Sequence, residues 1–202
     1  AQIRPIRPPL CPACGVPFLG ETGADHLCGD CLISSRAFSK ARAAGRYENV
    51  LLKAIHDFKY RRKTGLGEIL GQMMADHDFP AFHIPSYTLI MPVPLHVSRL
   101  RERTFNQALI LARAIAVRHA IRLDFTSLQR CIPTPPQIGL GKAERQTNVR
   151  GAFVVTPRKV HGEKVIIIDD VYTTGSTLSE CARVLMEGGA AEVAVLTLAR
   201  AL

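Results

Sequence analysis

The sequence lacks any apolar run long enough to cross a membrane, and its first ten residues lack the apolar stretch of a secretory signal. We therefore expect a cytoplasmic protein with no membrane partner. The P-loop pattern G-x-x-x-x-G-K-[ST] is also missing, which excludes the common nucleotide-binding loop. Acidic residues are scarce, since 17 Asp and Glu stand against 26 Lys and Arg, for a formal net charge of +9. This excess favours phosphorylated ligands or nucleic acid, or serves solubility alone.

The stretch VIIIDDVYTTGST, residues 165–177, is the most informative part of the chain. Its first four residues are apolar and β-branched, which is typical of a strand buried on both faces of a parallel sheet. Two aspartates and a hydroxyl-rich loop follow, and a helical pattern begins at Leu178. Ligands of open α/β sheets bind beyond the carboxyl ends of the strands. The sequence therefore places a candidate binding site at this turn.

The residue types in this turn suit a phosphorylated sugar. Backbone N–H groups at a helix N-terminus favour an anion, and hydroxyl groups donate to phosphate oxygens. Asp169 and Asp170 would repel a phosphate, so we expect them to face sugar hydroxyls or a divalent cation. The alternatives are an ordinary turn with solvated aspartates, or a receiver-type phospho-acceptor, whose further acidic cluster and Lys we do not find. The loop residues expected at the ligand are Val171, Thr173, Thr174, Gly175, Ser176 and Thr177.

This stretch resembles the phosphoribosyl pyrophosphate (PRPP) motif of the type I phosphoribosyltransferases. The resemblance implies an α/β fold, a mostly parallel twisted sheet flanked by helices, with strands near 87–91, 165–168 and 193–198. It further implies that Asp169 and Asp170 are catalytic residues that hold the ribose hydroxyls, directly or through Mg²⁺. The loop after them would hold the 5′-phosphate.

Two C-x₂-C pairs, CPAC and CGDC, stand thirteen residues apart near the start of the chain. Such spacing brings four thiolates within reach of one Zn²⁺, and four thiolates leave no open catalytic position. We predict a structural zinc ribbon over residues 8–36; two disulfides are the alternative, disfavoured in a reducing cytosol. Chelation should unfold residues 11–31 alone, unless the ribbon packs into the core of the main domain. The expected ligands are Cys11, Cys14, Cys28 and Cys31.

Between the ribbon and residue 87 the sequence predicts a basic connector over residues 38–48 and helices over 49–60 and 66–78. The first helix ends in the basic run HDFKYRRK, residues 56–63. We interpret this run as a solvated helix end, because cations are favourable at a helix C-terminus. The alternative is a contact for a polyanion, with Tyr60 free to stack on a base.

The segment PVPLHVSRLRERTFNQA, residues 92–108, follows a predicted strand and leads into a helix over 106–119. In type I phosphoribosyltransferases the loop after the first sheet strand binds pyrophosphate. The resemblance thus implies PRPP contacts at Pro92, Val93, Pro94, Arg99, Arg101 and Arg103.

The combination of PVPL, R-x-R-x-R and FNQA behind a four-cysteine ribbon is similar to the ComF family, which is linked to DNA uptake in natural competence. Thr104 departs from the pattern, since Gly is expected before FNQ. The resemblance implies single-stranded DNA and other competence proteins as partners, and leaves a homodimer open.

Residues 130–151 show no periodic apolar pattern. A long irregular segment inside a domain is usually a functional lid or is disordered. Type I phosphoribosyltransferases have a flexible hood at this place, so we expect Lys142 and Arg145 to act as catalytic cations that neutralise pyrophosphate when the hood closes. The alternative is a mobile hairpin loop without a role.

Two hypotheses follow for the domain that we expect over residues 45–202. The first is an enzyme that transfers phosphoribosyl from PRPP to a nitrogen acceptor, with Mg²⁺, and releases pyrophosphate. The second is a non-catalytic module that senses PRPP or handles single-stranded DNA, whose binding should fall steeply with salt.

Overall fold

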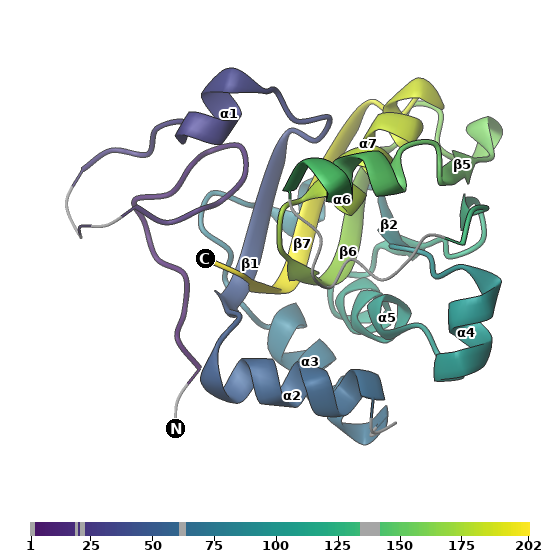
Figure 1. The fold of residues 1–202 in the computed structure, drawn as a ribbon, viewed down its shortest axis with the longest axis horizontal. Helices are drawn as coiled ribbons and strands as arrows, with labels where there is room; N and C mark the ends of the chain where they lie inside the picture. Colours follow the sequence, from purple (N-terminus) through teal and green to yellow (C-terminus); the bar gives the residue numbers. More distant parts are fainter. Residues whose placement is uncertain (1–2, 19, 21–22, 61–63, 134–141) are drawn as a thin grey trace.

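The computed structural model describes residues 3–18, 20, 23–60, 64–133 and 142–202. Within these ranges a five-stranded parallel sheet runs through the centre, with the strand order β1-β7-β6-β2-β3 (Figure 1). The three strands that the sequence predicts are confirmed as neighbours in the middle of this sheet. The strands are β1 (Lys40–Arg46), β2 (Leu89–Pro92), β3 (Arg122–Leu123), β6 (Lys164–Tyr172) and β7 (Glu192–Arg200).

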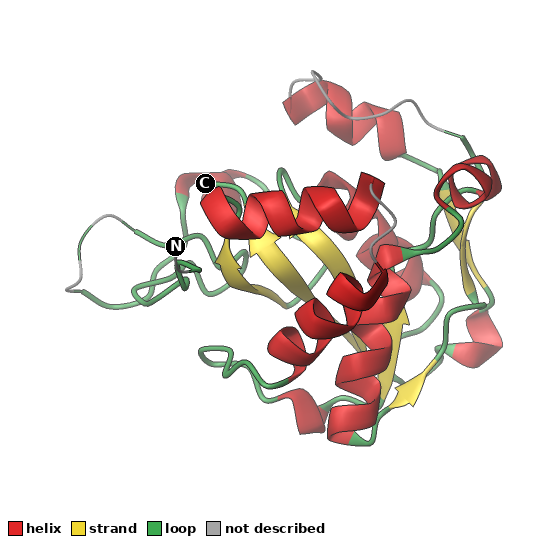
Figure 2. Cartoon of the chain, turned by 90° about the horizontal axis from the view of Figure 1, so that it is seen from below, coloured by secondary structure: helices red, strands yellow, loops and turns green. Residues whose placement is uncertain are grey.

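Helices cover both faces of the sheet. In the view from below, the helices of one face lie in front of the strands (Figure 2). One face carries α2 (Asn49–Tyr60), α3 (Thr64–Ala75) and α5 (Gln107–His119), and the other carries α7 (Ser176–Glu187). The side chains of β6 alternate between the two faces. Val165 and Ile167 belong to the core beneath α7, whereas Ile166 and Ile168 belong to the core beneath the other three helices. The uninterrupted apolar run thus follows from burial on both faces.

The remaining elements are short. An antiparallel pair, β4 (Leu128–Arg130) with β5 (Phe153–Val155), carries α6 (Lys142–Val149) between its strands. The predicted hood segment therefore contains a helix that its apolar pattern did not reveal. The others are α1 (Gly29–Ile33), α4 (Val97–Arg103) and two 3₁₀ turns, Ile84–Ser86 and Pro157–Lys159. In the described ranges no helix has both the length and the apolar character that a membrane span requires.

The prediction of a basic connector over residues 38–48 is wrong, because Lys40–Arg46 form the edge strand β1, paired with β7. Small side chains, among them Ala41 and Ala43, let this strand pack closely. Arg42 is also buried, and its guanidinium donates to the carbonyl oxygens of Pro80 (2.8 Å) and Pro12 (3.1 Å). A buried Arg among alanines does not show the apolar alternation by which strands are recognised.

The expected loop of residues 171–177 is shorter than predicted. Strand β6 continues to Tyr172, and α7 begins at Ser176 instead of Leu178. The phenol ring of Tyr172 is buried, and the guanidinium carbon of Arg200 lies 4.1 Å from its centroid. This packing extends the strand past the two aspartates, so the connecting turn contains only residues 173–175.

The N-terminal segment packs on the outer edge of the sheet, beside β1 (Figure 1). The amide of Ala41 donates to the carbonyl of Ala13 (2.7 Å), and the amide of Arg46 donates to that of Arg4 (2.9 Å). From the end of β7, Arg200 donates to the carbonyl oxygen of Cys14 (2.6 Å). The cysteine-rich segment and the sheet therefore share one core.

Thr104 ends α4 in the left-handed region, with φ 69°. This conformation favours glycine, which explains why Gly is expected at this position. The hydroxyl of Thr104 donates to the carbonyl oxygen of Arg103 (2.5 Å). The departure at Thr104 therefore leaves the turn between α4 and α5 intact.

Candidate functional site

A cavity of about 520 Å³ lies at the carboxyl ends of β2 and β6. The chain leaves β2 toward β3 on one side and leaves β6 toward β7 on the other, so the strand order reverses between these two strands. Such a switch point is where open α/β sheets bind their ligands. The side chains and loops around the cavity come from α2, the β2–α5 segment, β4 and the β6–α7 turn.

The β6–α7 turn is shaped for an anion. Gly175 has φ 78°, and a Cβ atom there would lie 2.3 Å from the phenol oxygen of Tyr172, so no other residue fits. Gly175 has no side chain with which to cap α7. The Ser176 N–H donates to the Thr174 hydroxyl (3.4 Å), and the first-turn residues of the helix line the cavity. Of the predicted loop residues, those that line the cavity are Val171, Thr173, Gly175, Ser176 and Thr177. Thr174 does not line it, but its hydroxyl lies 2.9 Å from that of Ser176.

Asp169 and Asp170 both line the cavity. The Asp170 carboxylate is buried and forms an ion pair with Lys59, whose Nζ lies 2.8 Å from Oδ2. The amide of Asp170 donates to the Asp169 carboxylate (2.9 Å). Burial, reinforced by the neighbouring charge of Asp170, raises the pKa of Asp169 to about 7.

Lys59 is a site residue that our sequence analysis interpreted wrongly as part of a solvated helix end. Its side chain is only 17% exposed. Burial acts to lower the pKa of Lys59, but the charge of Asp170 outweighs this effect and raises the pKa. One pattern could have revealed it: Leu51, Ile55, Phe58 and Lys59 follow the i, i+4, i+7, i+8 spacing of a single buried helix face. Residues 61–63, the rest of the basic run, lie outside the described residues.

The structure separates the three arginines of R-x-R-x-R. Arg99 and Arg103 line the cavity, whereas Arg101 is exposed and does not. Arg103 lies over the ring of Tyr60, with 5.3 Å between the guanidinium carbon and the ring centroid. Arg130, which the sequence analysis did not select, adds a further cation from β4. Three guanidinium groups therefore border the cavity among the described residues.

The PVPL loop is held by the start of α5. Asn106 donates to the carbonyl oxygen of Val93 (3.0 Å), and its own amide oxygen accepts from the Ala108 N–H (2.9 Å). Val93 lines the cavity; Pro92 belongs to β2 and Pro94 is not at the cavity wall. Gln107 lines it too, buried to 5% exposure, and its side-chain oxygen has no hydrogen-bond partner among the described atoms.

The two hood cations cannot be placed at the cavity from the described part of the chain. Lys142 and Arg145 belong to α6, and their side chains lie outside the described residues. The hood is joined to α7 through Glu180, whose carboxylate accepts from the amide of Gly151 (2.7 Å).

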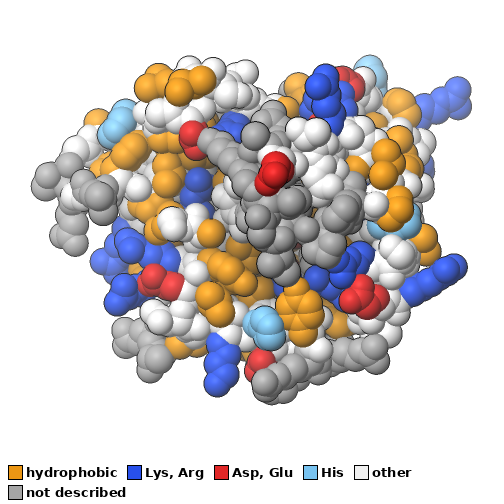
Figure 3. Space-filling model, in the orientation of Figure 1, with side chains coloured by type: hydrophobic (Ala, Val, Ile, Leu, Met, Phe, Trp, Pro, Cys, Tyr) orange, Lys and Arg blue, Asp and Glu red, His pale blue; other side chains and the backbone are white. Residues whose placement is uncertain are grey.

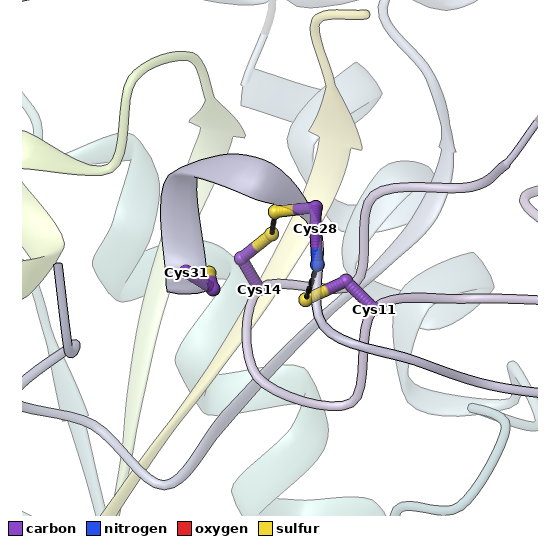
Figure 4. Close-up of side chains that lie close together, drawn as sticks. All are labelled: Cys11, Cys14, Cys28 and Cys31. Atoms are coloured by element: carbon purple, nitrogen blue, oxygen red, sulfur yellow. Dashed lines mark hydrogen bonds between the residues drawn. The ribbon is translucent and has the colours of Figure 1, made fainter. Parts of the chain in front are cut away.

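The four predicted cysteine ligands come together at the edge of the sheet (Figure 4). Their sulfur atoms all lie within 4.8 Å of one another, and those of Cys14 and Cys28 are 3.6 Å apart. A tetrahedral site with Zn–S bonds near 2.3 Å requires sulfur separations of about 3.8 Å. Burial raises the pKa of the Cys14 thiol to about 12, although Arg200 opposes this effect. This cluster can hold a metal ion, which would have to displace protons on binding.

Comparisons with known proteins agree with this architecture. The family model described as phosphoribosyl transferase domain matches residues 108–202. The DNA utilization protein YhgH of Escherichia coli O6:H1 is 32% identical over 196 residues, which cover 96% of this chain and 85% of that protein. Competence protein F of Haemophilus influenzae is 30% identical, over 95% of this chain and 90% of its own. The chain belongs to the ComF family.

Competence protein ComFC of Bacillus subtilis is 29% identical over 212 residues, which cover 99% of this chain and 81% of that protein. Among solved structures, glutamine PRPP amidotransferase of B. subtilis matches 65% of this chain and 25% of its own, with a TM-score of 0.42 and 20% identity. A hypoxanthine phosphoribosyltransferase from Staphylococcus aureus matches 66% and 62%, with a TM-score of 0.37 and 12% identity. The match to the phosphoribosyl transferase domain, together with the parallel sheet flanked by helices, shows that this ComF protein has a type I phosphoribosyltransferase fold.

The pKa of Asp169 leads to a prediction about stability. Between about pH 4 and pH 7 the folded protein binds this proton more tightly than the unfolded chain does, so the native protein loses stability as the pH rises through that window. Asp169→Asn removes the titrating group. We expect it to raise the free energy of unfolding by about 1–2 kcal/mol at pH 8, and by less at pH 5, in urea titrations at both values.

The matched control is Asp76→Asn. Gln72 and Arg118 hold the pKa of that exposed carboxyl below its ordinary value, so its contribution to stability is lost only when the pH falls below about 4. Its removal should therefore lower stability by the same amount at pH 5 and at pH 8. Equal effects of Asp169→Asn at the two pH values would contradict the burial of its charge.

Proposed function

We propose that this ComF chain binds PRPP, or a related phosphorylated sugar, in the cavity between β2 and β6. The observation that carries the proposal is that the anion-binding turn at Gly175 and the acidic pair directly before it border one cavity. A sugar phosphate needs both kinds of partner a few atoms apart: N–H and hydroxyl donors for its phosphate, and carboxylate acceptors for its hydroxyls.

Each group then has a role. The first-turn N–H groups of α7 and the hydroxyls of Ser176 and Thr177 hold the 5′-phosphate, and Asp169 and Asp170 accept hydrogen bonds from the ribose hydroxyls. The guanidinium groups at the other wall of the cavity neutralise the diphosphate. They are Arg99, Arg103 and Arg130.

We further propose transfer of the phosphoribosyl group to a nitrogen acceptor. The bond from the anomeric carbon to the diphosphate oxygen breaks, pyrophosphate leaves with the electron pair, and a C–N bond forms. Positive charge that develops on the ribose is stabilised by the acidic pair, and negative charge on pyrophosphate by the arginines. Mg²⁺ bound with the diphosphate would add to this neutralisation. Catalysis would consist of positioning and electrostatics.

A second candidate function is a role in handling single-stranded DNA. The printed names of its relatives, DNA utilization protein and competence proteins, support it, as does the net charge of +9. Tyr60 is 51% exposed beside Arg103, an arrangement on which a base could stack. On the face seen in Figure 3, Lys and Arg side chains stand in several separate groups and form no continuous stripe. Salt-sensitive DNA binding that survives loss of the acidic pair would support this candidate.

The cysteine cluster supports a structural Zn²⁺ as a third element of the proposal. Its four ligands are all thiols, which zinc prefers in closed structural sites. Zinc would join the loop of Cys11 and Cys14 to the start of α1. Because Arg200 binds the carbonyl of Cys14, such a site would also fix the end of β7.

Thermal unfolding with PRPP and Mg²⁺ tests the sugar site. A ligand at a hundred times its dissociation constant adds about 2.7 kcal/mol, and for this size each kcal/mol raises the midpoint by about 2–4 °C. We expect a rise in the native chain, none in Asp169→Asn/Asp170→Asn, and a reduced rise in Arg103→Ala. Release of pyrophosphate upon addition of an acceptor then tests transfer.

Arg101→Ala is the control for Arg103→Ala, because it removes an exposed arginine of the same helix outside the cavity. It should keep the full rise. If PRPP at millimolar concentration stabilises neither the native chain nor Arg101→Ala, the cavity does not bind this ligand.

Zinc removal tests the cysteine site. Because Cys11, Cys14 and Cys31 belong to the same core cluster as β6 and β7, we now expect chelation to lower the midpoint of the whole chain instead of unfolding residues 11–31 alone. Amide hydrogen exchange of β1 and β7 should rise in parallel. Cys28→Ser should reproduce the effect, and Cys131→Ser, at an exposed thiol, should not. Unchanged exchange in β7 after complete zinc removal would contradict this coupling.

A further inference from the structure

The ion pair between Lys59 and Asp170 lies inside the cavity, yet the proposed binding of a sugar phosphate does not require it. We propose that Lys59 is a positioning and specificity residue. Its ammonium group occupies the position beside the acidic pair that a metal ion would otherwise take, so the pair binds a sugar diol and no divalent metal ion. This inference rests on the proposed function for the identity of the sugar, but its claim about metal ions does not.

The geometry leaves little room for a metal ion at Asp170. The Nζ atom of Lys59 lies 2.8 Å from Oδ2, and the two side chains are 17% and 4% exposed. Mg²⁺ binds carboxylate oxygens at about 2.0–2.1 Å and requires a near-octahedral shell of further ligands around it. An ammonium group this close to the same oxygen occupies part of that shell and repels the ion. A metal ion could bind this Oδ2 atom of Asp170 only after Lys59 had left.

The main chain around Lys59 is held in place by two other elements. Phe58 is fully buried and stacks on Phe105, in the α4–α5 connection, with 5.3 Å between the ring centroids. On the other side α3 approaches so closely that a Cβ atom on Gly67 would lie 2.4 Å from the Phe58 ring. Lys59 is therefore presented to the acidic pair by a packed helix end, which distinguishes it from a flexible surface lysine.

The charges around the acidic pair also disfavour a divalent metal ion. Asp170 contacts Lys59 directly, the charge of Asp169 interacts with Lys59 and with Arg130, and the charge of Arg103 acts on Lys59. Two carboxylates against these cations leave no net negative charge to attract a divalent ion. A neutral diol needs only acceptor oxygens, and the carboxylate oxygens that Lys59 does not contact provide them. Any Mg²⁺ bound with PRPP would then stay on the diphosphate.

The test uses Mn²⁺ and ribose 5-phosphate as probes on the full chain in metal-free buffer, without chelator so that the cysteine site is left intact. Free Mn²⁺ is measured by electron paramagnetic resonance, and sugar binding by calorimetry. The native chain should bind ribose 5-phosphate equally well with and without Mg²⁺ and should bind no Mn²⁺ at the acidic pair. Lys59→Met should weaken sugar binding at least tenfold and create one Mn²⁺ site, which a second change, Asp170→Asn, removes.

Two controls separate positioning from general damage. Lys53→Met removes an exposed lysine of the same helix and should behave like the native chain. Lys59→Arg keeps the cation and should exclude Mn²⁺ while recovering part of the sugar affinity. If Lys59→Met does not fold, Gly67→Ala takes its place: it should displace Phe58 and Lys59 and weaken sugar binding, whereas Gly65→Ala, which meets no atom within 4 Å, should not.

The inference is overturned if the native chain binds Mn²⁺ at a site that Asp170→Asn abolishes, or if Lys59→Met binds ribose 5-phosphate as tightly as the native chain. If the native chain binds neither ribose 5-phosphate nor PRPP, the proposed function fails. The appearance or absence of a Mn²⁺ site in Lys59→Met then still decides whether Lys59 holds the cation place.

Discussion

The burial of β6 on both faces is the constraint on which the site depends. Its neighbours β2 and β7 pair with it on either side, and its apolar residues alternate between two cores. The strand is therefore fixed in the sheet, and the residues at its carboxyl end are fixed with it. Asp169 and Asp170 are held there at the edge of the sheet, one turn before the N-terminus of α7. A rigid strand thus brings acceptors for hydroxyls and donors for a phosphate within one cavity.

The site is completed by segments distant in the sequence, each anchored by apolar packing. Lys59 is held at the site by α2, because Phe58 is packed between α3 and Phe105. The arginines at the cavity belong to α4 and β4. At the far edge, the cysteine cluster and Arg200 join the N-terminal segment to the last strand. The charged groups are therefore positioned by neighbours that take no part in the chemistry, which is how a fold can keep a destabilising acidic pair in place.

Much of this could be predicted from the sequence, because the features concerned are local. The apolar run of β6, the DD-x₂-TTGST turn and the C-x₂-C spacing each carry their physical meaning within a few residues. What the sequence did not reveal depends on long-range contacts. Strand β1 has a buried Arg42 that donates to the carbonyl groups of Pro12 and Pro80, which are distant in the sequence, as well as to that of Ala41. Likewise Lys59 reads as a surface residue until Asp170, more than a hundred positions later, is placed beside it.

The central claim is that the turn at Gly175 and the acidic pair hold the two ends of one sugar phosphate. A crystal structure of the chain with PRPP and Mg²⁺ tests this claim most directly. We expect the 5′-phosphate on the first-turn N–H groups of α7, the ribose hydroxyls on Asp169 and Asp170, and the diphosphate toward Arg99 and Arg103. Electron density for PRPP at another place, or for the diphosphate in the Gly175 turn, would contradict it.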